Sequence, residues 1–229
     1  YNRLWIGTKG NGIVRVKNYE QYANGTDINP SDIETLGVSD GLLDDQVFNI
    51  ERSLCHDDLL WITSRGPGIN YYTFSDNKIH SLQHPMLRII NEIYEENDSV
   101  LWLASSIYGV VRLSIEKNGE QLSIKSCRNY VFKRGEYLCS EVYSFVPDGM
   151  GSLYVGCRGG LGVAKFDLKT SEYSFLLSDV SAMGDVICML QLNDSVMFYG
   201  ASSGMGRIKL NNLGSLITTY DHSKGMRND

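Results

Sequence analysis

The sequence contains little proline and no long apolar run, and these two features limit the classes of protein to consider. Only 4 of its 229 residues are proline, and Asp, Asn, Gly or Arg interrupts every apolar stretch before 18 residues. A transmembrane helix needs about 20 apolar residues, so we predict no membrane insertion of this segment. The first residues, YNRLWIG, lack the basic head and apolar block of a signal peptide and are typical of the middle of a strand.

The chain also lacks an excess of positive charge. Its 21 Lys and Arg residues are outnumbered by 27 Asp and Glu residues, which gives a formal net charge of -6. A general binder of phosphate backbones needs the opposite sign, so we predict no nucleic-acid partner. The composition is 42% hydrophobic and 10% aromatic, which suffices for a sizeable core and excludes disorder.

The cysteines provide no metal-binding motif. Their number is odd, and no CxxC occurs among Cys55, Cys127, Cys139, Cys157 and Cys188. Zinc sites need such closely spaced ligands, and no phosphate-binding or calcium-binding loop is present. We therefore predict no metal and no cofactor. Cys157 and Cys188 lie at apolar strand positions, where we expect small buried side chains, and whether any cysteines pair is left open.

One pattern recurs five times and places an aromatic residue between two aliphatic ones. The copies are LWIGT from Leu4, LWITS from Leu60, LWLAS from Leu101, LYVGC from Leu153 and the divergent MFYGA from Met197. Their starts are separated by 56, 41, 52 and 44 residues. Repeats of about 40 to 50 residues with several short strands are typical of propeller blades. No long amphipathic run of period 3.6 favours helical repeats instead.

Each repeat divides into four elements, a to d, of which the aromatic pattern is b. Element a precedes it, as in QVFNIERS from Gln46, and a glycine-bearing turn leads to element c, as in RGPGINYY from Arg65. A polar turn then leads to d, for which the five copies are IETLGV, KIHSLQ, SIKSCRNYVF, YSFLLSD and SLITTYD. We predict an all-β fold over residues 1–229, a β-propeller segment of four-stranded antiparallel blades.

The aromatic pattern predicts that both faces of a blade are buried. Side chains of a strand alternate between its faces, so Leu4 and Ile6 point to one side and Trp5 to the other. A blade between two neighbours meets this requirement. We expect the tryptophans to be core residues rather than sugar-stacking platforms, and loss of Trp61 or Trp102 to cost about 3–5 kcal/mol.

The first repeat resembles the two-component regulator propeller repeat. LWIGT with its glycine-bearing turn and SDGLLDDQVFNI from Ser39 carry the resemblance, which extends over the whole chain, although Ile107 and Tyr108 stand where small residues are usual. Such repeats form periplasmic sensor regions of hybrid histidine kinases in gut bacteria that use polysaccharides. The resemblance implies a non-catalytic periplasmic sensor of an oligosaccharide, a histidine kinase elsewhere in the full protein, and a homodimer formed through the full sensor region.

The number of strands predicts an incomplete set of blades. Elements b, c and d occur five times, whereas element a occurs only four times. KGMRND at 224–229 matches DGLLDD at 40–45, which leads directly into an element a. We therefore expect about five blades, one of them lacking a strand, within a larger propeller of about seven blades.

The b-to-c turns and d-to-a connections of a propeller open on the same face. Polar residues in these loops are the candidate ligand-binding residues, namely Lys9, Arg65, Arg88, Tyr108, Arg134 and Arg158, together with Asn11 and Tyr137. Arg and Tyr suit sugars or acidic oligosaccharides. The alternative for each residue is an ordinary solvated loop position.

Two other functions remain as alternatives. One is a propeller lyase that acts on a cyclic peptide or a polysaccharide with a histidine base, and the other is a scaffold for protein partners. The four histidines, His56, His80, His84 and His222, occupy unrelated places in the repeats, and His84 is the best candidate base. Because no acid, base and nucleophile cluster together, we predict no catalytic residues in this segment.

Overall fold

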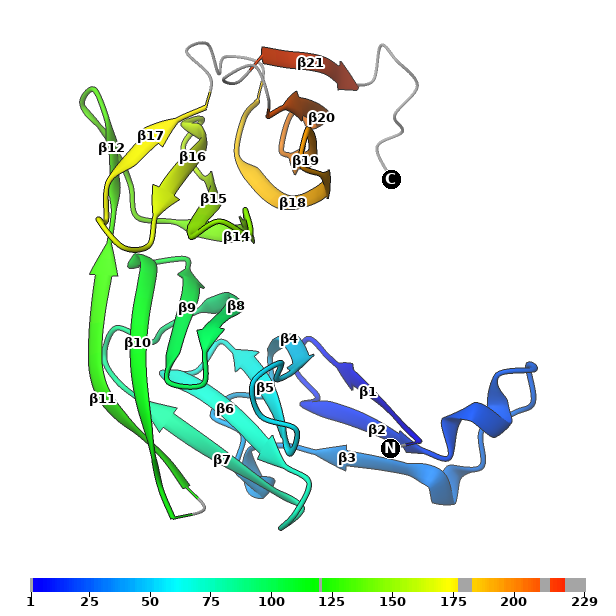
Figure 1. Cartoon of the computed structure of the whole chain (residues 1–229). Helices are drawn as coiled ribbons and strands as arrows, with labels where there is room; N and C mark the ends of the chain where they lie inside the picture. Colours follow the sequence, from blue (N-terminus) through cyan, green and yellow to red (C-terminus); the bar gives the residue numbers. More distant parts are fainter. Residues whose placement is uncertain (1, 120, 177–182, 211–214, 221–229) are drawn as a thin grey trace. The chain divides into compact units, whose positions relative to one another are not determined.

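The computed structural model describes residues 2–119, 121–176, 183–210 and 215–220, and the statements below concern these ranges. Strands form nearly all of the regular structure (Figure 1), with three short 3-10 helices and no α-helix among the described residues. The prediction of an all-β fold is confirmed. Within the same ranges, no helix has the length and apolar character that a membrane crossing requires.

Five sheets follow one another along the chain, and the first three cover its first 130 residues. The first sheet contains β1 (Arg3–Gly7), β2 (Ile13–Lys17) and β3 (Ile33–Leu36). The second contains β4 (Val47–Arg52), β5 (Leu59–Ser64), β6 (Gly68–Thr73) and β7 (Lys78–Gln83). The third contains β8 (Ile90–Asn97), β9 (Val100–Ser105), β10 (Gly109–Asn118) and β11 (Gln121–Tyr130).

The last two sheets repeat the four-stranded order. The fourth contains β14 (Val142–Pro147), β15 (Ser152–Cys157), β16 (Gly162–Asp167) and β17 (Tyr173–Phe175). The fifth contains β18 (Val186–Asn193), β19 (Val196–Ala201), β20 (Gly204–Lys209) and β21 (Ser215–Tyr220). Strands adjacent in sequence pair in antiparallel fashion in the second, fourth and fifth sheets. In the described residues, elements b, c and d therefore occur five times and element a four times, as predicted.

One hairpin was not predicted. β12 (Phe132–Arg134) and β13 (Tyr137–Cys139) form a separate two-stranded sheet between β11 and β14. The expectation that SIKSCRNYVF forms one strand is thus wrong at its end, because β11 stops at Tyr130. The chain leaves the sheet there because Phe132 is fully buried against Phe166 and Tyr173, with ring centroids 5.6 and 5.0 Å away.

The chain separates into two compact units, each of which is described by itself. Unit 1 comprises residues 1–103 and 112–128, and unit 2 comprises residues 104–111 and 129–229. The first two sheets lie in unit 1 and the last two in unit 2, whereas the third contributes residues to both.

The central strands of the inner sheets are buried on both faces, whereas the first and fifth sheets have exposed apolar side chains. Every residue of β5 and of β15 is buried. In β1, however, Leu4 is 41% exposed and Ile6 42% exposed, and in β18 Leu190 is 65% exposed. The prediction of two covered faces is therefore wrong for the first and fifth sheets, because within its own unit each has a described neighbouring sheet on one face alone.

Trp5 packs against a buried cation. Its ring lies 5.1 Å from the guanidinium carbon of Arg15, which also lies 5.7 Å from the ring of Tyr72. Arg15 is buried, donates to the Tyr72 hydroxyl over 3.0 Å, and donates through Nε to Glu34 over 2.8 Å. A buried cation needs such partners, so the aromatic pattern of the first sheet positions an ion pair as well as an apolar core.

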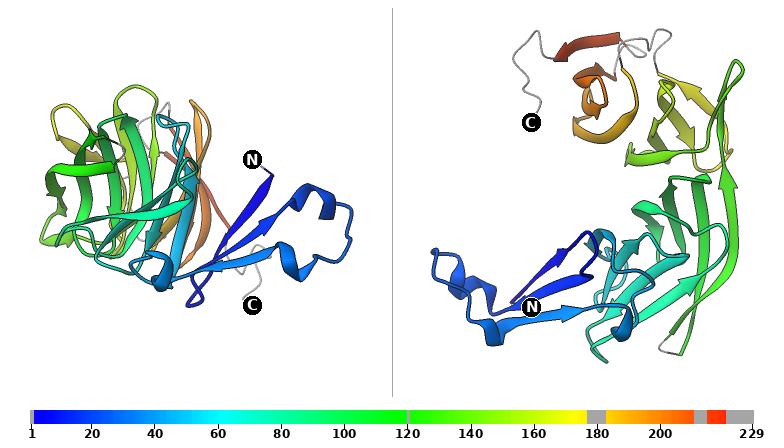
Figure 2. Two further views of the ribbon diagram at one scale, coloured as in Figure 1. Left: turned by 90° about the horizontal axis from the view of Figure 1, so that it is seen from below. Right: turned by 180° about the vertical axis from the view of Figure 1, so that it is seen from behind.

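Glycine turns and one long loop complete the first sheet. Gly12 has φ 66°, and a Cβ there would collide with the carbonyl oxygen of Leu36, which explains why the β1–β2 turn requires glycine. The β2–β3 connection carries η1 (Tyr19–Tyr22) and η2 (Pro30–Asp32) and extends beyond the strands (Figure 2). The Tyr22 hydroxyl fixes it by donating to Asp32 over 2.6 Å. A third short helix, η3 (Val38–Asp40), precedes β4.

Candidate functional site

The b-to-c turns and the d-to-a connections contact each other within each unit, as the antiparallel order requires. The Arg65 N–H donates to the Gln46 carbonyl over 3.1 Å in unit 1. In unit 2, the Arg158 N–H donates to the Glu141 carbonyl over 3.2 Å and the Ser202 N–H to the Asp185 carbonyl over 2.9 Å. These repeated bonds place the residue after element b beside the residue before element a.

The eight candidate residues are divided equally between the units. Lys9, Asn11, Arg65 and Arg88 lie in unit 1 and are exposed. In unit 2, Tyr137 and Arg158 are exposed, whereas Tyr108 and Arg134 are half-buried. Each set has to be considered as a site within its own unit.

Arg158 is the centre of a polar cluster in unit 2. Its guanidinium donates to Glu141 over 2.5 Å, to the Tyr143 hydroxyl over 3.0 Å and to Asp185 over 3.2 Å. The hydrogen bonds that Arg158 donates to Glu141 and then to Asp185 raise the pKa of Arg158. Partial burial raises the pKa of Asp185, but hydrogen bonds from the Gly159 N–H and the Arg158 guanidinium lower it more. The pKa of this carboxyl therefore lies below its ordinary value. These shifts favour the charged forms of Arg158 and Asp185, and Glu141 forms a second ion pair with the same guanidinium.

This cluster forms the wall of a depression, which we call the unit 2 hollow. Its volume is about 270 Å³, and its lining residues are Leu138, Cys139, Ser140, Glu141, Arg158, Gly159 and Asp185. They come from β13, from the two connections that precede β14 and β18, and from the β15–β16 turn. The hollow thus combines hydrogen-bond donors and acceptors with the exposed side chain of Leu138.

Arg134 and Tyr108, two other candidates in unit 2, have structural contacts. Arg134 donates to the Leu161 carbonyl over 3.0 Å, and its guanidinium carbon lies 5.0 Å from the Phe175 ring centroid. These contacts hold β12 on the fourth sheet. The Tyr108 N–H donates to the Ser105 hydroxyl over 3.1 Å, and its carbonyl accepts from Asn129 over 3.2 Å. Neither residue lines the unit 2 hollow.

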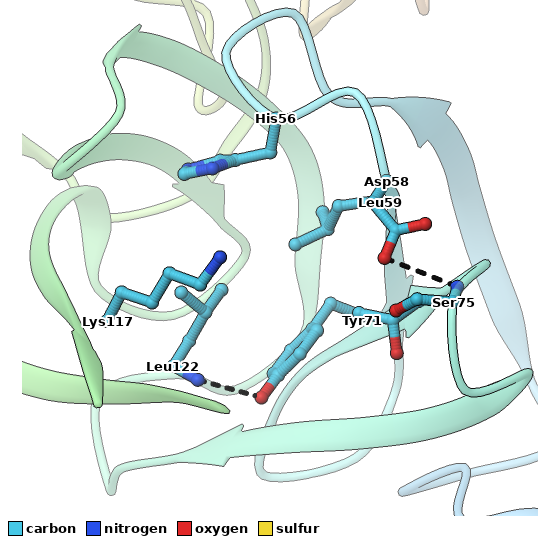
Figure 3. Close-up of a pocket in the computed structure, with 8 residues that line it drawn as sticks. His56, Asp58, Leu59, Tyr71, Ser75, Lys117 and Leu122 are labelled. Carbon is cyan, nitrogen blue, oxygen red and sulfur yellow. Dashed lines mark hydrogen bonds between the residues drawn. The ribbon is translucent and has the colours of Figure 1, made fainter. Parts of the chain in front are cut away.

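A second depression lies in unit 1, at the a-to-b and c-to-d turns, which are at the opposite ends of the strands from the b-to-c turns. We call it the unit 1 hollow. It holds about 180 Å³ and is lined by His56, Asp58, Leu59, Tyr71, Thr73, Ser75, Lys117 and Leu122. In Figure 3 the side chains of His56 and Lys117 face the same space, and the Tyr71 hydroxyl closes it by accepting from the Leu122 N–H over 3.0 Å. Sequence reasoning missed this hollow because Lys117 and Leu122 belong to the following repeat.

The described histidines have local partners. His56 Nε2 lies 3.0 Å from the Asp98 carbonyl oxygen, and His80 Nε2 lies 2.9 Å from Asp76 while its ring stacks on Tyr71. His84, the candidate base, accepts the Met86 N–H over 3.2 Å at Nδ1, within a turn. His222 lies outside the described residues. Among the residues that are described, no three His, Cys, Asp or Glu side chains are grouped as metal ligands.

Comparisons with known proteins find a similar fold in extracellular domains of signalling proteins and in a lyase. No family model and no curated protein matches the sequence. The extracellular domain of a putative hybrid two-component system from B. thetaiotaomicron superposes with a TM-score of 0.70 at 19% identity, over 99% of this chain and 28% of that chain. The extracellular domain of a putative one-component system from the same organism gives 0.72 at 17% identity, over 97% and 30%.

A lyase has a similar fold. Virginiamycin B lyase from Staphylococcus aureus gives a TM-score of 0.62 at 15% identity, over 94% of this chain and 66% of that chain. Identities this low establish the fold alone, so the predicted resemblance to sensor propellers is confirmed at the level of the fold. The chain spans about three-tenths of the length of the two sensor domains.

Proposed function

We propose that this chain is a segment of a non-catalytic periplasmic sensor propeller that binds an oligosaccharide and regulates a histidine kinase in the full protein. The observation that carries the proposal is the fold match, over nearly the whole chain, to extracellular domains of two putative signalling proteins. A homodimer formed through the full sensor region belongs to the same proposal.

The unit 2 hollow supports a neutral sugar as the ligand. The charge of Arg158 is already matched by Glu141 and Asp185, so an acidic sugar would meet two carboxylates and one paired guanidinium. Sugar hydroxyls, in contrast, can donate to the carboxylates and accept from Arg158 and Tyr143, and charge-assisted hydrogen bonds are the stronger ones. Leu138 supplies apolar surface for the C–H face of a sugar ring.

The position of the hollow suggests how binding would be transmitted. Glu141 directly precedes β14 and Asp185 directly precedes β18, while Arg158 follows β15. A ligand that contacts all three would favour one relative position of the fourth and fifth sheets. A ligand shifts a conformational equilibrium only by such a difference in affinity between two states.

Calorimetric titration of the full sensor region with neutral and acidic oligosaccharides tests this proposal. We expect a neutral member to bind, and Arg158→Ala to weaken binding by about tenfold or more, because loss of a charge-assisted hydrogen bond costs about 1.5–3 kcal/mol. The melting temperature should change little, because exposed ion pairs contribute about 0–1 kcal/mol. Lys169→Ala is the control, since Lys169 is an exposed cation in the β16–β17 turn of the same unit.

The outcomes separate the choice of site from the choice of function. Arg65→Ala and Arg88→Ala test the candidate residues of unit 1 separately. Binding that withstands all three arginine substitutions would refute the site and leave the sensor role standing. Failure of every saccharide to bind the full sensor region would refute the carbohydrate ligand.

A lyase is the second candidate, favoured by the fold match to virginiamycin B lyase. Product analysis on the titrated samples, with a cyclic peptide added to the panel, tests it. Turnover of a panel member that is lost in the His84→Ala variant would refute the sensor proposal and support a lyase. Binding without turnover supports the sensor.

A further inference from the structure

The unpredicted hairpin brings two cysteines of unit 2 together. Cys139 is the last residue of β13, and Cys157 is the last residue of β15. The chain turns after Cys139 and enters β14, where Val142 pairs directly with Cys157 across the sheet. The backbone bond from Arg158 to Glu141 fixes the same turn.

The two thiols interact with each other inside the protein, and the backbone N–H of Arg158 interacts with Cys139. Cys139 Sγ lies 3.3 Å from the Glu141 carbonyl oxygen, and Cys157 Sγ lies 3.7 Å from the Val155 carbonyl oxygen. Cys139 is 2% exposed and Cys157 is fully buried, so the surrounding core holds this pair in place. The remaining cysteines lie in other elements: Cys55 and Cys127 in unit 1, and Cys188 on β18.

The interactions around Cys139 lower the pKa of its thiol. The contact with Cys157 lowers the pKa most, burial and the charge of Glu141 oppose this shift, and backbone hydrogen bonds from Arg158 and Glu141 lower the pKa further. The same contact raises the pKa of Cys157 well above its usual range. The thiolate is the nucleophile of disulfide exchange, so Cys139 is the attacking sulfur, and it lines the unit 2 hollow through which a donor would approach.

We propose that Cys139 and Cys157 form a disulfide by exchange with a disulfide donor. The Cys139 thiolate attacks one donor sulfur, which forms a mixed disulfide and releases one donor thiolate. Cys157 then loses its proton and attacks Cys139 Sγ, which releases the second donor thiolate. The two protons of the cysteines pass to the two donor thiolates, so the donor disulfide is reduced to two thiols while the protein dithiol is oxidised.

The bond would fix the wall of the hollow that the proposed function assigns to the ligand. It would fasten β13 to β15 and hold Leu138 and Ser140 beside Arg158. The inference rests on the proposed periplasmic position only for the oxidising environment in which disulfides persist. Its test uses no ligand and no cell, so it can fail without the sensor role failing.

Peptide mapping of the intact chain provides the test. The purified protein is incubated with oxidised glutathione, free thiols are alkylated under denaturing conditions, and the sample is digested without reduction by a glutamyl endopeptidase. Cleavage after Glu141 separates the two cysteines. We expect the peptide that ends at Glu141 to be linked to the peptide that contains Cys157, with Cys55, Cys127 and Cys188 alkylated. In a separate sample of the intact oxidised protein, reduction should lower the melting temperature by about 5–10 °C.

Variants distinguish this pair from other pairings. Cys157→Ser should leave Cys139 as a mixed disulfide with glutathione, whereas Cys188→Ser should retain both the linked peptides and the melting shift. The proposal is overturned if the oxidised wild-type protein carries alkylated Cys139 and Cys157, or if either one is linked to another cysteine. The primary readout is on the wild-type chain, so a variant that fails to fold does not affect it.

Discussion

Glu95 shows how a single residue links two sheets of unit 1. It lies on β8 and is buried, yet its carboxylate accepts from the Ser53 hydroxyl over 2.6 Å, from the Cys55 N–H over 3.2 Å and from the indole of Trp61 over 2.7 Å. A buried carboxylate is tolerated only with such partners. The indole of Trp61 therefore contributes a specific polar contact in addition to the apolar surface that the aromatic pattern predicts.

Glu51 is the residue of unit 1 with the clearest pH dependence. Burial first, and then the nearby charges of Glu92 and Glu95, raise its pKa to about 7, while a hydrogen bond from Asn49 opposes the shift. The folded protein therefore binds this proton more tightly than the unfolded chain does. The resulting stabilisation is complete below pH 4.5, the ordinary value, and is lost as the pH rises through about 7.

We expect Glu51→Gln to remove this pH dependence. A shift from 4.5 to about 7 corresponds to roughly 3 kcal/mol, so above pH 7 the variant should be more stable than the wild type by up to that amount. Below pH 4.5 the two should be similar. Chemical denaturation at several pH values measures the difference, and parallel curves for the two proteins from pH 4 to pH 8 would contradict it.

At the scale of elements, the β12–β13 hairpin is attached to the fourth sheet by aromatic packing and backbone bonds. Phe132 is fully buried between Phe166 and Tyr173. The Tyr173 hydroxyl accepts the Lys133 N–H over 2.8 Å and donates to the Lys133 carbonyl over 3.2 Å. The hairpin is therefore part of the packed structure of unit 2, and it positions Leu138 and Cys139 at the hollow.

We expect Phe132→Ala to lower the free energy of unfolding by about 3–5 kcal/mol, because it leaves a cavity in a packed aromatic cluster. Tyr137→Ala in the same hairpin is the control, since Tyr137 is largely exposed, and its change should stay within about 0.5 kcal/mol. Denaturation followed by far-ultraviolet circular dichroism measures both. Equal effects of the two substitutions would show that the hairpin does not pack as described.

At the scale of the whole molecule, the fifth sheet carries an uncovered apolar surface. Ile187, Leu190 and Leu192 of β18 are exposed, and a depression of about 350 Å³ beside them is lined by Cys188, Met189, Leu190, Phe198, Tyr199, Gly200 and Met205. Exposed apolar surface concentrated on one sheet marks an interaction site or a tendency to associate. The inner strand β15, in contrast, is buried throughout.

We expect a protein consisting of residues 1–229 to self-associate through this surface. Exchanging Leu190 and Leu192 for serine should raise the dissociation constant by about tenfold or more, because each leucine contributes about 1.5–3 kcal/mol when buried. Met150→Ser is the control, since Met150 is highly exposed in the β14–β15 turn. Sedimentation velocity at several concentrations measures the effect, and a wild-type monomer at every concentration would refute the expectation.

The sequence by itself determined the strands and their order. The expected element KIHSLQ coincides with β7, Lys78–Gln83, and the five aromatic patterns fall on β1, β5, β9, β15 and β19. Alternation of side chains and the glycine turns are local properties of the backbone, so they can be recognised without knowing any distant contact. The break between β11 and β12 at Val131 was not predicted, because no glycine or proline marks it in the sequence. The packing of Phe132, a tertiary contact, causes it.

The contacts between repeats were decided only by the tertiary structure. The polar loops that could hold a ligand were predictable, and Arg158 does line a hollow, but its pairing with Glu141 and Asp185 depends on residues 17 and 27 positions away. The same is true of Trp61 with Glu95 and of Cys139 with Cys157. Sequence periodicity specifies which face a side chain occupies, whereas its partner depends on how one sheet packs against the next.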